Sequence, residues 1–259
     1  MQPVIQAKKE IIINRAFANE REIDMNFIKL GYRRMPGTEQ IYTRIVSSLF
    51  MLREREGMSS FVFSGCDRNV GNTTISLSIA SELAKADRRT LLVDCDFLKP
   101  ATEKRLFQFV DVGLADHLSG NARPEDIINK TDIQALDYIS SGRCLMNPTM
   151  MLWSDMFMNF MNNLAKRYEY IIFDTAPVLA APEVCVIALR ASGTILTVQF
   201  GKSQKSQIFA SKKELEKMGA NLLGVIVNKT PDDECRIYQK THGFSIVLKG
   251  PQEIRSSDG

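Results

Sequence analysis

The chain has 259 residues, of which 44% are hydrophobic and 24% are charged, and its formal net charge is +3. These values are ordinary for a soluble globular protein with one sizeable core, and so small a net charge gives no argument for a nucleic-acid partner. No apolar run approaches a membrane span, and residues 1–6 do not resemble a signal peptide. The five scattered cysteines form no CxxC pair, which argues against a disulfide framework or a zinc site and favours a cytoplasmic protein.

Residues 1–36 are polar and weakly periodic, and we interpret them as an N-terminal arm. From residue 38 onward, helical stretches alternate with short apolar runs that suit buried strands. The predicted helices are Thr38–Glu56, Thr73–Ala86, Pro124–Asn129, Met150–Arg167, Pro182–Ala191 and Gln204–Met218. The predicted strands are Ser60–Ser64, Thr90–Asp94, Ala135–Ser140, Tyr170–Asp174, Thr194–Phe200 and Leu223–Asn228.

This alternation predicts an α/β domain over residues 37–230, doubly wound around a mostly parallel sheet and similar to the P-loop NTPases. Residues 231–259 contain scattered glycine and proline and are expected to form an irregular C-terminal tail. Ligands of doubly wound folds bind at the carboxyl ends of the strands. The residues that follow each predicted strand are therefore the candidates for a functional site.

The segment after the first of these strands, residues 64–74, reads SGCDRNVGNTT and is similar to a phosphate-binding loop. The usual pattern is G-x-x-x-x-G-K-[ST], in which backbone N–H groups hold phosphates, the lysine reaches the β- and γ-phosphates, and the hydroxyl binds Mg²⁺. Gly71 and Thr73-Thr74 match this pattern, but Asn72 replaces the lysine and Cys66 the first glycine. Taken alone, the segment is equally compatible with an ordinary turn between a strand and a helix.

Acidic side chains follow two further predicted strands. Asp94 and Asp96 come at the end of one apolar run, and Asp174 ends another, as the Walker B carboxylate does when it orients Mg²⁺. Asn228 ends the last strand, where its amide could both donate to and accept from an adenine edge. The alternative interpretations are a solvated strand end for a single aspartate and a turn residue for Asn228.

Together these motifs resemble the cytoplasmic kinase domain of the bacterial tyrosine kinases (BY-kinases) of capsule and exopolysaccharide systems, which belong to the deviant-Walker P-loop group. The resemblance covers about residues 38–230. Its most specific parts are GLADHLSG at Gly113–Gly120, ISSG at Ile139–Gly142, Asn147-Pro148, DTAPV at Asp174–Val178 and GVIVNK at Gly224–Lys229. These parts favour the tyrosine kinases over the related partition ATPases, which switch with bound nucleotide.

The resemblance implies ATP or ADP and Mg²⁺ as ligands. Thr73, Asp94 and Asp174 would hold the metal, and Asp96 and Asp174 would be the catalytic acids. The nucleotide would contact Gly71, Asn72, Thr73, Thr74 and Asn228. The resemblance also implies an inner-membrane polysaccharide co-polymerase of the chain-length determinant type, or its cytosolic segment, as the partner that recruits the chain to the membrane face, and it is compatible with a homo-oligomer.

Several departures from the family pattern weaken the catalytic interpretation. Asn72 and Asn69 replace a lysine and a glycine of the loop, and the expected oligomerisation helix at residues 40–48 lacks the family's spaced arginines. The family's C-terminal tyrosine cluster is reduced to Tyr238. We therefore expect a degenerate, non-catalytic protein with weakened nucleotide binding, a pseudokinase. The alternative is an active tyrosine autokinase with atypical phosphate contacts, in which Arg68 could act as a substitute cation.

Overall fold

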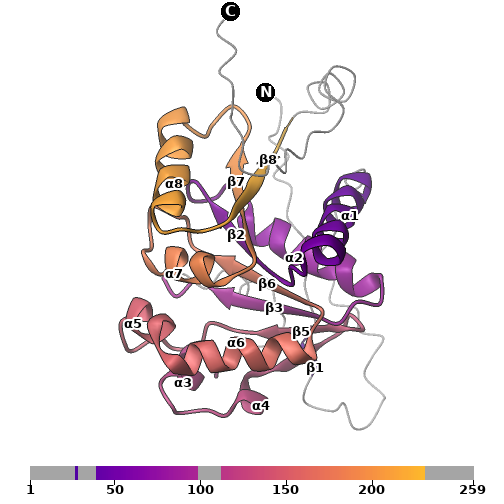
Figure 1. Cartoon of the computed structure of the whole chain (residues 1–259), viewed down its shortest axis with the longest axis vertical. Helices are drawn as coiled ribbons and strands as arrows, with labels where there is room; N and C mark the ends of the chain where they lie inside the picture. The colour runs from indigo at the N-terminus through magenta and orange to yellow at the C-terminus, as the bar shows by residue number, and fades with distance from the viewer. Residues whose placement is uncertain (1–26, 29–38, 99–111, 231–259) are drawn as a thin grey trace, which may run out of the picture.

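The computed structural model describes residues 27–28, 39–98 and 112–230 (Figure 1). Most of the predicted arm, and the predicted tail of residues 231–259 with Tyr238, lie outside the described residues. The interpretation of these two segments stays a prediction.

The described residues form strands and helices in the predicted alternation. The strands are β1 (Phe27–Ile28), β2 (Ser60–Gly65), β3 (Thr90–Cys95), β4 (Asn129–Thr131), β5 (Leu136–Ile139), β6 (Tyr170–Thr175), β7 (Gly193–Gln199) and β8 (Leu222–Asn228). The helices are α1 (Glu39–Glu56), α2 (Asn72–Lys85), α3 (Leu114–Leu118), α4 (Pro124–Ile127), α5 (Pro148–Trp153), α6 (Asp155–Arg167), α7 (Glu183–Arg190) and α8 (Lys205–Lys217).

The strands form one sheet in the order β1-β4-β5-β3-β6-β2-β7-β8. Every neighbouring pair is parallel except β4 and β5, so the prediction of a mostly parallel sheet is confirmed. The strand β2 lies between β6 and β7. Strands that come later in the chain are therefore added to the sheet on both sides of β2. Doubly wound folds bind their ligands at the carboxyl end of the strand where this occurs.

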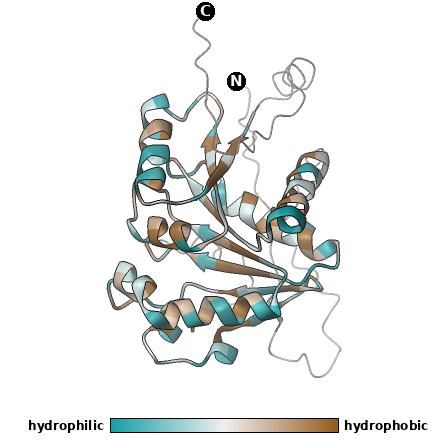
Figure 2. Ribbon diagram, viewed as in Figure 1, coloured by the Kyte–Doolittle hydropathy of each residue, from teal (hydrophilic) through white to brown (hydrophobic). Residues whose placement is uncertain are grey.

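Helices cover both faces of the sheet (Figure 1). α1 and α2 pack on one face, and α3, α5, α6 and α7 share a hydrophobic cluster on the other. Successive residues of a strand point to opposite faces, so Ile171 and Phe173 of β6 enter one cluster while Tyr170 and Ile172 enter the other. Figure 2 shows the central strands as apolar over most of their length, as strands buried on both faces are, with hydrophilic residues at their carboxyl ends.

The differences from the predicted elements are local. The single helix expected over Met150–Arg167 is two helices, because Ser154 adopts an extended conformation and its side chain caps α6 by accepting from the Phe157 N–H. The helix predicted over Pro124–Asn129 ends at Ile127, and the chain enters β4. β1, β4 and α3 were not predicted. Within residues 39–98 and 112–230, no helix is long and apolar enough to cross a membrane.

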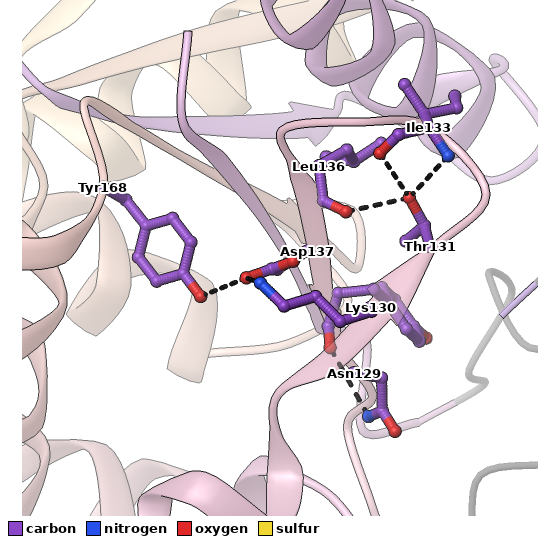
Figure 3. A network of polar contacts seen from close by, with 8 residues as sticks. Asn129, Lys130, Thr131, Ile133, Leu136, Asp137 and Tyr168 are labelled. Carbon is purple, nitrogen blue, oxygen red and sulfur yellow. Dashed lines mark hydrogen bonds and ion pairs between the residues drawn. The ribbon is translucent and has the colours of Figure 1, made fainter. Parts of the chain in front are cut away.

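A buried polar network ties β4 and β5 to the segment that precedes β6 (Figure 3). The Asp137 carboxylate, on β5, accepts from the Tyr168 hydroxyl at 2.7 Å and from the Lys130 ammonium at 2.8 Å. Burial, followed by this hydrogen bond to the carboxylate, raises the pKa of Tyr168 above its ordinary value. The Tyr168 hydroxyl is therefore protonated and remains a hydrogen-bond donor at neutral pH.

We expect Tyr168→Phe to lower the free energy of unfolding by about 1–2 kcal/mol, because it removes a buried hydrogen bond to a carboxylate. Urea unfolding at pH 7.5 measures this change. Lys212→Met is the control: the ion pair of Lys212 with Glu216 lies on the surface of α8, and such surface ion pairs contribute about 0.5 kcal/mol. Equal losses in the two variants would show that the hydroxyl has no special role.

Candidate functional site

The predicted phosphate loop lies between β2 and α2, at the carboxyl edge of the sheet. Gly71 is the N-cap residue of α2 and has a positive φ of 95°. No side chain caps this helix end, and its first turn carries no acidic residue. The partial positive charge of the helix N-terminus is therefore available to an anion. Thr73 and Thr74 both belong to this first turn.

The Asn72 side chain, at the lysine position, points into the sheet edge. Its Nδ2 atom donates to Asp174 Oδ1 at 2.8 Å, to the Phe63 carbonyl at 2.8 Å and to the Thr175 carbonyl at 3.3 Å. Its Oδ1 atom accepts from the Thr197 hydroxyl at 2.9 Å. One neutral amide thus links the start of α2 to the ends of β2, β6 and β7.

A second pair of side chains holds the loop from β8. Asn228 Nδ2 donates to the Val70 carbonyl at 2.7 Å, and its Oδ1 accepts from the Lys229 N–H at 2.8 Å. The Lys229 ammonium donates to the Asn69 carbonyl at 2.6 Å and to Gln199 Oε1 at 3.2 Å. A Cβ atom added to Gly71 would lie 2.2 Å from Asn228 Nδ2, and the φ of 95° strains any other residue, so both the contact and the backbone favour glycine here.

The predicted acids gather on the other side of the loop. Asp94 and Asp174 are opposite one another in the parallel register of β3 and β6, and both are fully buried. Asp94 Oδ1 accepts from the Asp96 N–H at 3.0 Å, which folds the chain after β3 back over its end. Burial raises the pKa of the Cys95 thiol well above its ordinary value, and the charges of Asp94, Asp174 and Asp96 raise it further. Two buried carboxyl groups thus lie side by side at the sheet edge, with Asp96 following directly in the chain.

The structure brings several predicted site residues into contact at the loop, but it leaves the side chain of Arg68 exposed. Asn72 contacts Asp174, while Asn228 packs on Gly71. Arg68, the predicted substitute cation, is exposed on the loop, and its guanidinium makes no hydrogen bond or ion pair with other described residues. The amide of Asn228, expected near the base, is engaged by Val70 and Lys229. Its contact with a base stays a prediction.

Sequence reasoning missed the residues that hold the loop from β7 and β8, namely Thr197, Gln199, Ser203 and Lys229. Ser203 Oγ accepts from the Gln199 N–H and lies 3.3 Å from Cys66 Sγ, at the start of the loop. Burial raises the pKa of the Cys66 thiol, so this position carries a neutral group. A signal for Gln199 was available, because it lies near the end of the predicted strand Thr194–Phe200, where site residues of this fold are found. Thr197 lies in the middle of that strand and carried no such signal.

The residues at this edge of the sheet fit a magnesium nucleotide, except that Asn72 does not supply the positive charge of the usual loop lysine. The uncapped helix N-terminus and Gly71 suit phosphate, and the paired acids suit a divalent cation. Among the described residues, no group of three or more His, Cys, Asp or Glu side chains is arranged to hold a metal by itself. Mg²⁺ would therefore need phosphate oxygens as additional ligands, as is usual for this ion.

The chain is similar in sequence and in fold to several known proteins. The family model described as an AAA domain matches residues 66–237. Tyrosine-protein kinase CpsD of Streptococcus agalactiae is 33% identical over 164 residues, which cover 62% of this chain and 70% of that protein. Tyrosine-protein kinase YwqD of Bacillus subtilis is 28% identical over 203 residues, which cover 78% and 85%. The crystal structure of the chimerical protein CapA2B2 has a TM-score of 0.71 at 27% identity, covering 76% of this chain and 87% of that one.

Proposed function

We propose that this chain, which belongs to the bacterial tyrosine kinase family, is a non-catalytic member that acts as a regulatory or scaffold partner in exopolysaccharide biosynthesis or export. The role is assigned to the domain of residues 37–230. Asp94, Asp174 and Thr73 are its proposed metal-facing groups, and Asp96 is the acid that an active relative would use beside Asp174.

The observation that carries the proposal is the placement of Asn72. Its amide is neutral and shorter than a lysine, and it donates to Asp174 and to two backbone carbonyls at the strand ends. It therefore offers no positive charge to a phosphate in the loop. An ammonium about 4 Å from a phosphate oxygen is worth roughly 4 kcal/mol at an effective dielectric constant near 20, before desolvation reduces that value.

Phosphoryl transfer should suffer more than binding from this loss. In the transition state, negative charge spreads over the oxygens of the transferred group, and positive charge placed there stabilises it more than the ground state. Asp94 and Asp174 place two carboxyl groups beside the site, so a bound nucleotide would depend on Mg²⁺ to offset repulsion between these acids and its phosphates. The arrangement favours weak binding of a magnesium nucleotide without efficient chemistry.

The proposed partner is an inner-membrane polysaccharide co-polymerase or its cytosolic segment, which would bring the chain to the membrane face. The family membership supports this role.

The test is an assay of the purified full chain with Mg-ATP and the cytosolic segment of its co-polymerase. We expect no ATP turnover above background and no phosphotyrosine by mass spectrometry. Asn72→Lys serves as the matched variant, because it restores the charge at the same position. Turnover by the natural chain that Asp174→Ala abolishes would overturn the proposal.

That overturning result would support the alternative, an active tyrosine autokinase with atypical phosphate contacts. One observation favours this alternative: the structure keeps Asp94 opposite Asp174, with Thr73 in the first turn of α2. The two functions differ in one measurable property, since only the autokinase would accumulate phosphotyrosine on the chain itself when ATP and partner are both present.

A further inference from the structure

Lys229 is a positioned cation at the loop that lacks its usual lysine. Its ammonium lies against the Asn69 carbonyl and Gln199 Oε1, both of which are neutral acceptors. Among the described residues, no carboxylate lies within ion-pair distance of it. The charge of Lys229 is therefore held at the loop without being neutralised, and at least one of its three N–H donors remains available.

The backbone explains how this side chain reaches the loop. Lys229 has a φ of 58°, in the left-handed region that few non-glycine residues adopt, and the Asn228 side chain accepts from its N–H there. The Lys229 Cε atom lies 3.8 Å from the position of a Cβ atom added to Gly71. The side chain thus runs along the loop from Gly71 to Asn69, and its rotamer freedom is already restricted.

Arg68 is the competing candidate. Its guanidinium is exposed and has no hydrogen bond or ion pair with other described residues, so a ligand would have to immobilise it. Ordering such a long side chain opposes binding, whereas a cation that is held in place before binding does not incur that loss. Preorganisation therefore favours Lys229.

We propose that Lys229 supplies the positive charge that draws the phosphates of a nucleoside diphosphate to this loop, in place of the absent lysine. Binding would combine the N-terminus of α2 with the ammonium that the Asn69 carbonyl and Gln199 hold at the loop. The inference rests on the proposed function only in treating the loop as a nucleotide site, and it requires no phosphoryl transfer.

The test is calorimetric titration of the full chain with Mg-ADP. We expect Lys229→Met, which keeps most of the unbranched side chain but removes its charged end, to raise the Kd about tenfold, as expected for one charge contact near a protein surface. Lys229→Arg should stay within about threefold of the natural chain. Lys202→Met removes an exposed lysine from the neighbouring turn and should change the Kd by less than about twofold.

Binding of uncharged adenosine distinguishes an effect of the Lys229 charge on phosphates from an effect of the substitution on the shape of the loop. If Lys229 acts on the phosphates, Lys229→Met should leave adenosine binding unchanged within about twofold, and the salt dependence of Mg-ADP binding should become shallower. Equal weakening of adenosine and Mg-ADP, a larger effect of Arg68→Met, or no binding of Mg-ADP by the natural chain would each overturn the proposal. Detectable phosphotyrosine would overturn the proposed function instead, which keeps the two failures distinct.

Discussion

Asn72→Asp should destabilise the protein by about 3 kcal/mol at pH 8, although it exchanges only an amide nitrogen for an oxygen. Asn72 Nδ2 is 2.8 Å from Asp174 Oδ1 and 2.8 Å from the Phe63 carbonyl oxygen. The substitution replaces this donor with an acceptor, so that two carboxylates face each other at the buried end of β6. Breaking a buried polar contact so that like charges meet typically costs several kcal/mol.

The loss of stability should depend on pH in a defined direction. Two facing carboxylates raise the pKa of the pair in the folded state above the unfolded value of about 3.9. The folded variant then binds more protons than the unfolded chain, so the penalty is absent below the unfolded pKa and grows as pH rises through the folded pKa. We expect the difference in free energy of unfolding between variant and natural chain to shrink between pH 8 and pH 5.

Urea unfolding at the two pH values measures this change. Asn163→Asp is the matched control, because it introduces the same charge at an exposed position of α6 and should change stability by less than about 0.5 kcal/mol. A pH-independent loss in Asn72→Asp, or a loss no larger than that of the control, would contradict the hydrogen bonding described for Asn72.

The loop illustrates what sequence patterns predict and where they stop. Gly71 and Thr73-Thr74 after an apolar run placed a strand, a loop and a helix correctly, because each signal is local. The partners of Asn72 come from strands that are distant in the chain and meet only in the sheet order β6-β2-β7. No local pattern contains that order, so the inward direction of the Asn72 amide could not be foreseen.

The missed elements have the same cause. β4 has the sequence NKT, which shows no apolar alternation, and it is a strand because it pairs with β1 and β5 at the edge of the sheet. The break between α5 and α6 did carry a local signal, since serine followed by aspartate is a common helix start.

We expect Gly113→Ala to cost about 3 kcal/mol or more, and the reason concerns the stretch that carries the most specific family resemblance. A Cβ atom on Gly113 would lie 2.4 Å from both the Gly142 nitrogen and the Ser140 carbonyl oxygen. These are backbone atoms that cannot rotate away, and overpacking against fixed atoms is strongly destabilising. The measurement is again urea unfolding, with a thermal melt to detect loss of cooperative folding.

Gly120→Ala separates this steric effect from backbone strain. Gly120 has a positive φ of 79° and open space around it, so alanine there should cost only about 1 kcal/mol. Gly113 has an extended φ of −151°, which alanine adopts freely, so its larger penalty would be purely steric. The packing fastens α3 to the end of β5, and β5 pairs with β3, which carries Asp94. If Gly113→Ala cost no more than Gly120→Ala, packing beside β3, the strand that carries Asp94, would not explain why residues 113–142 resemble the family pattern.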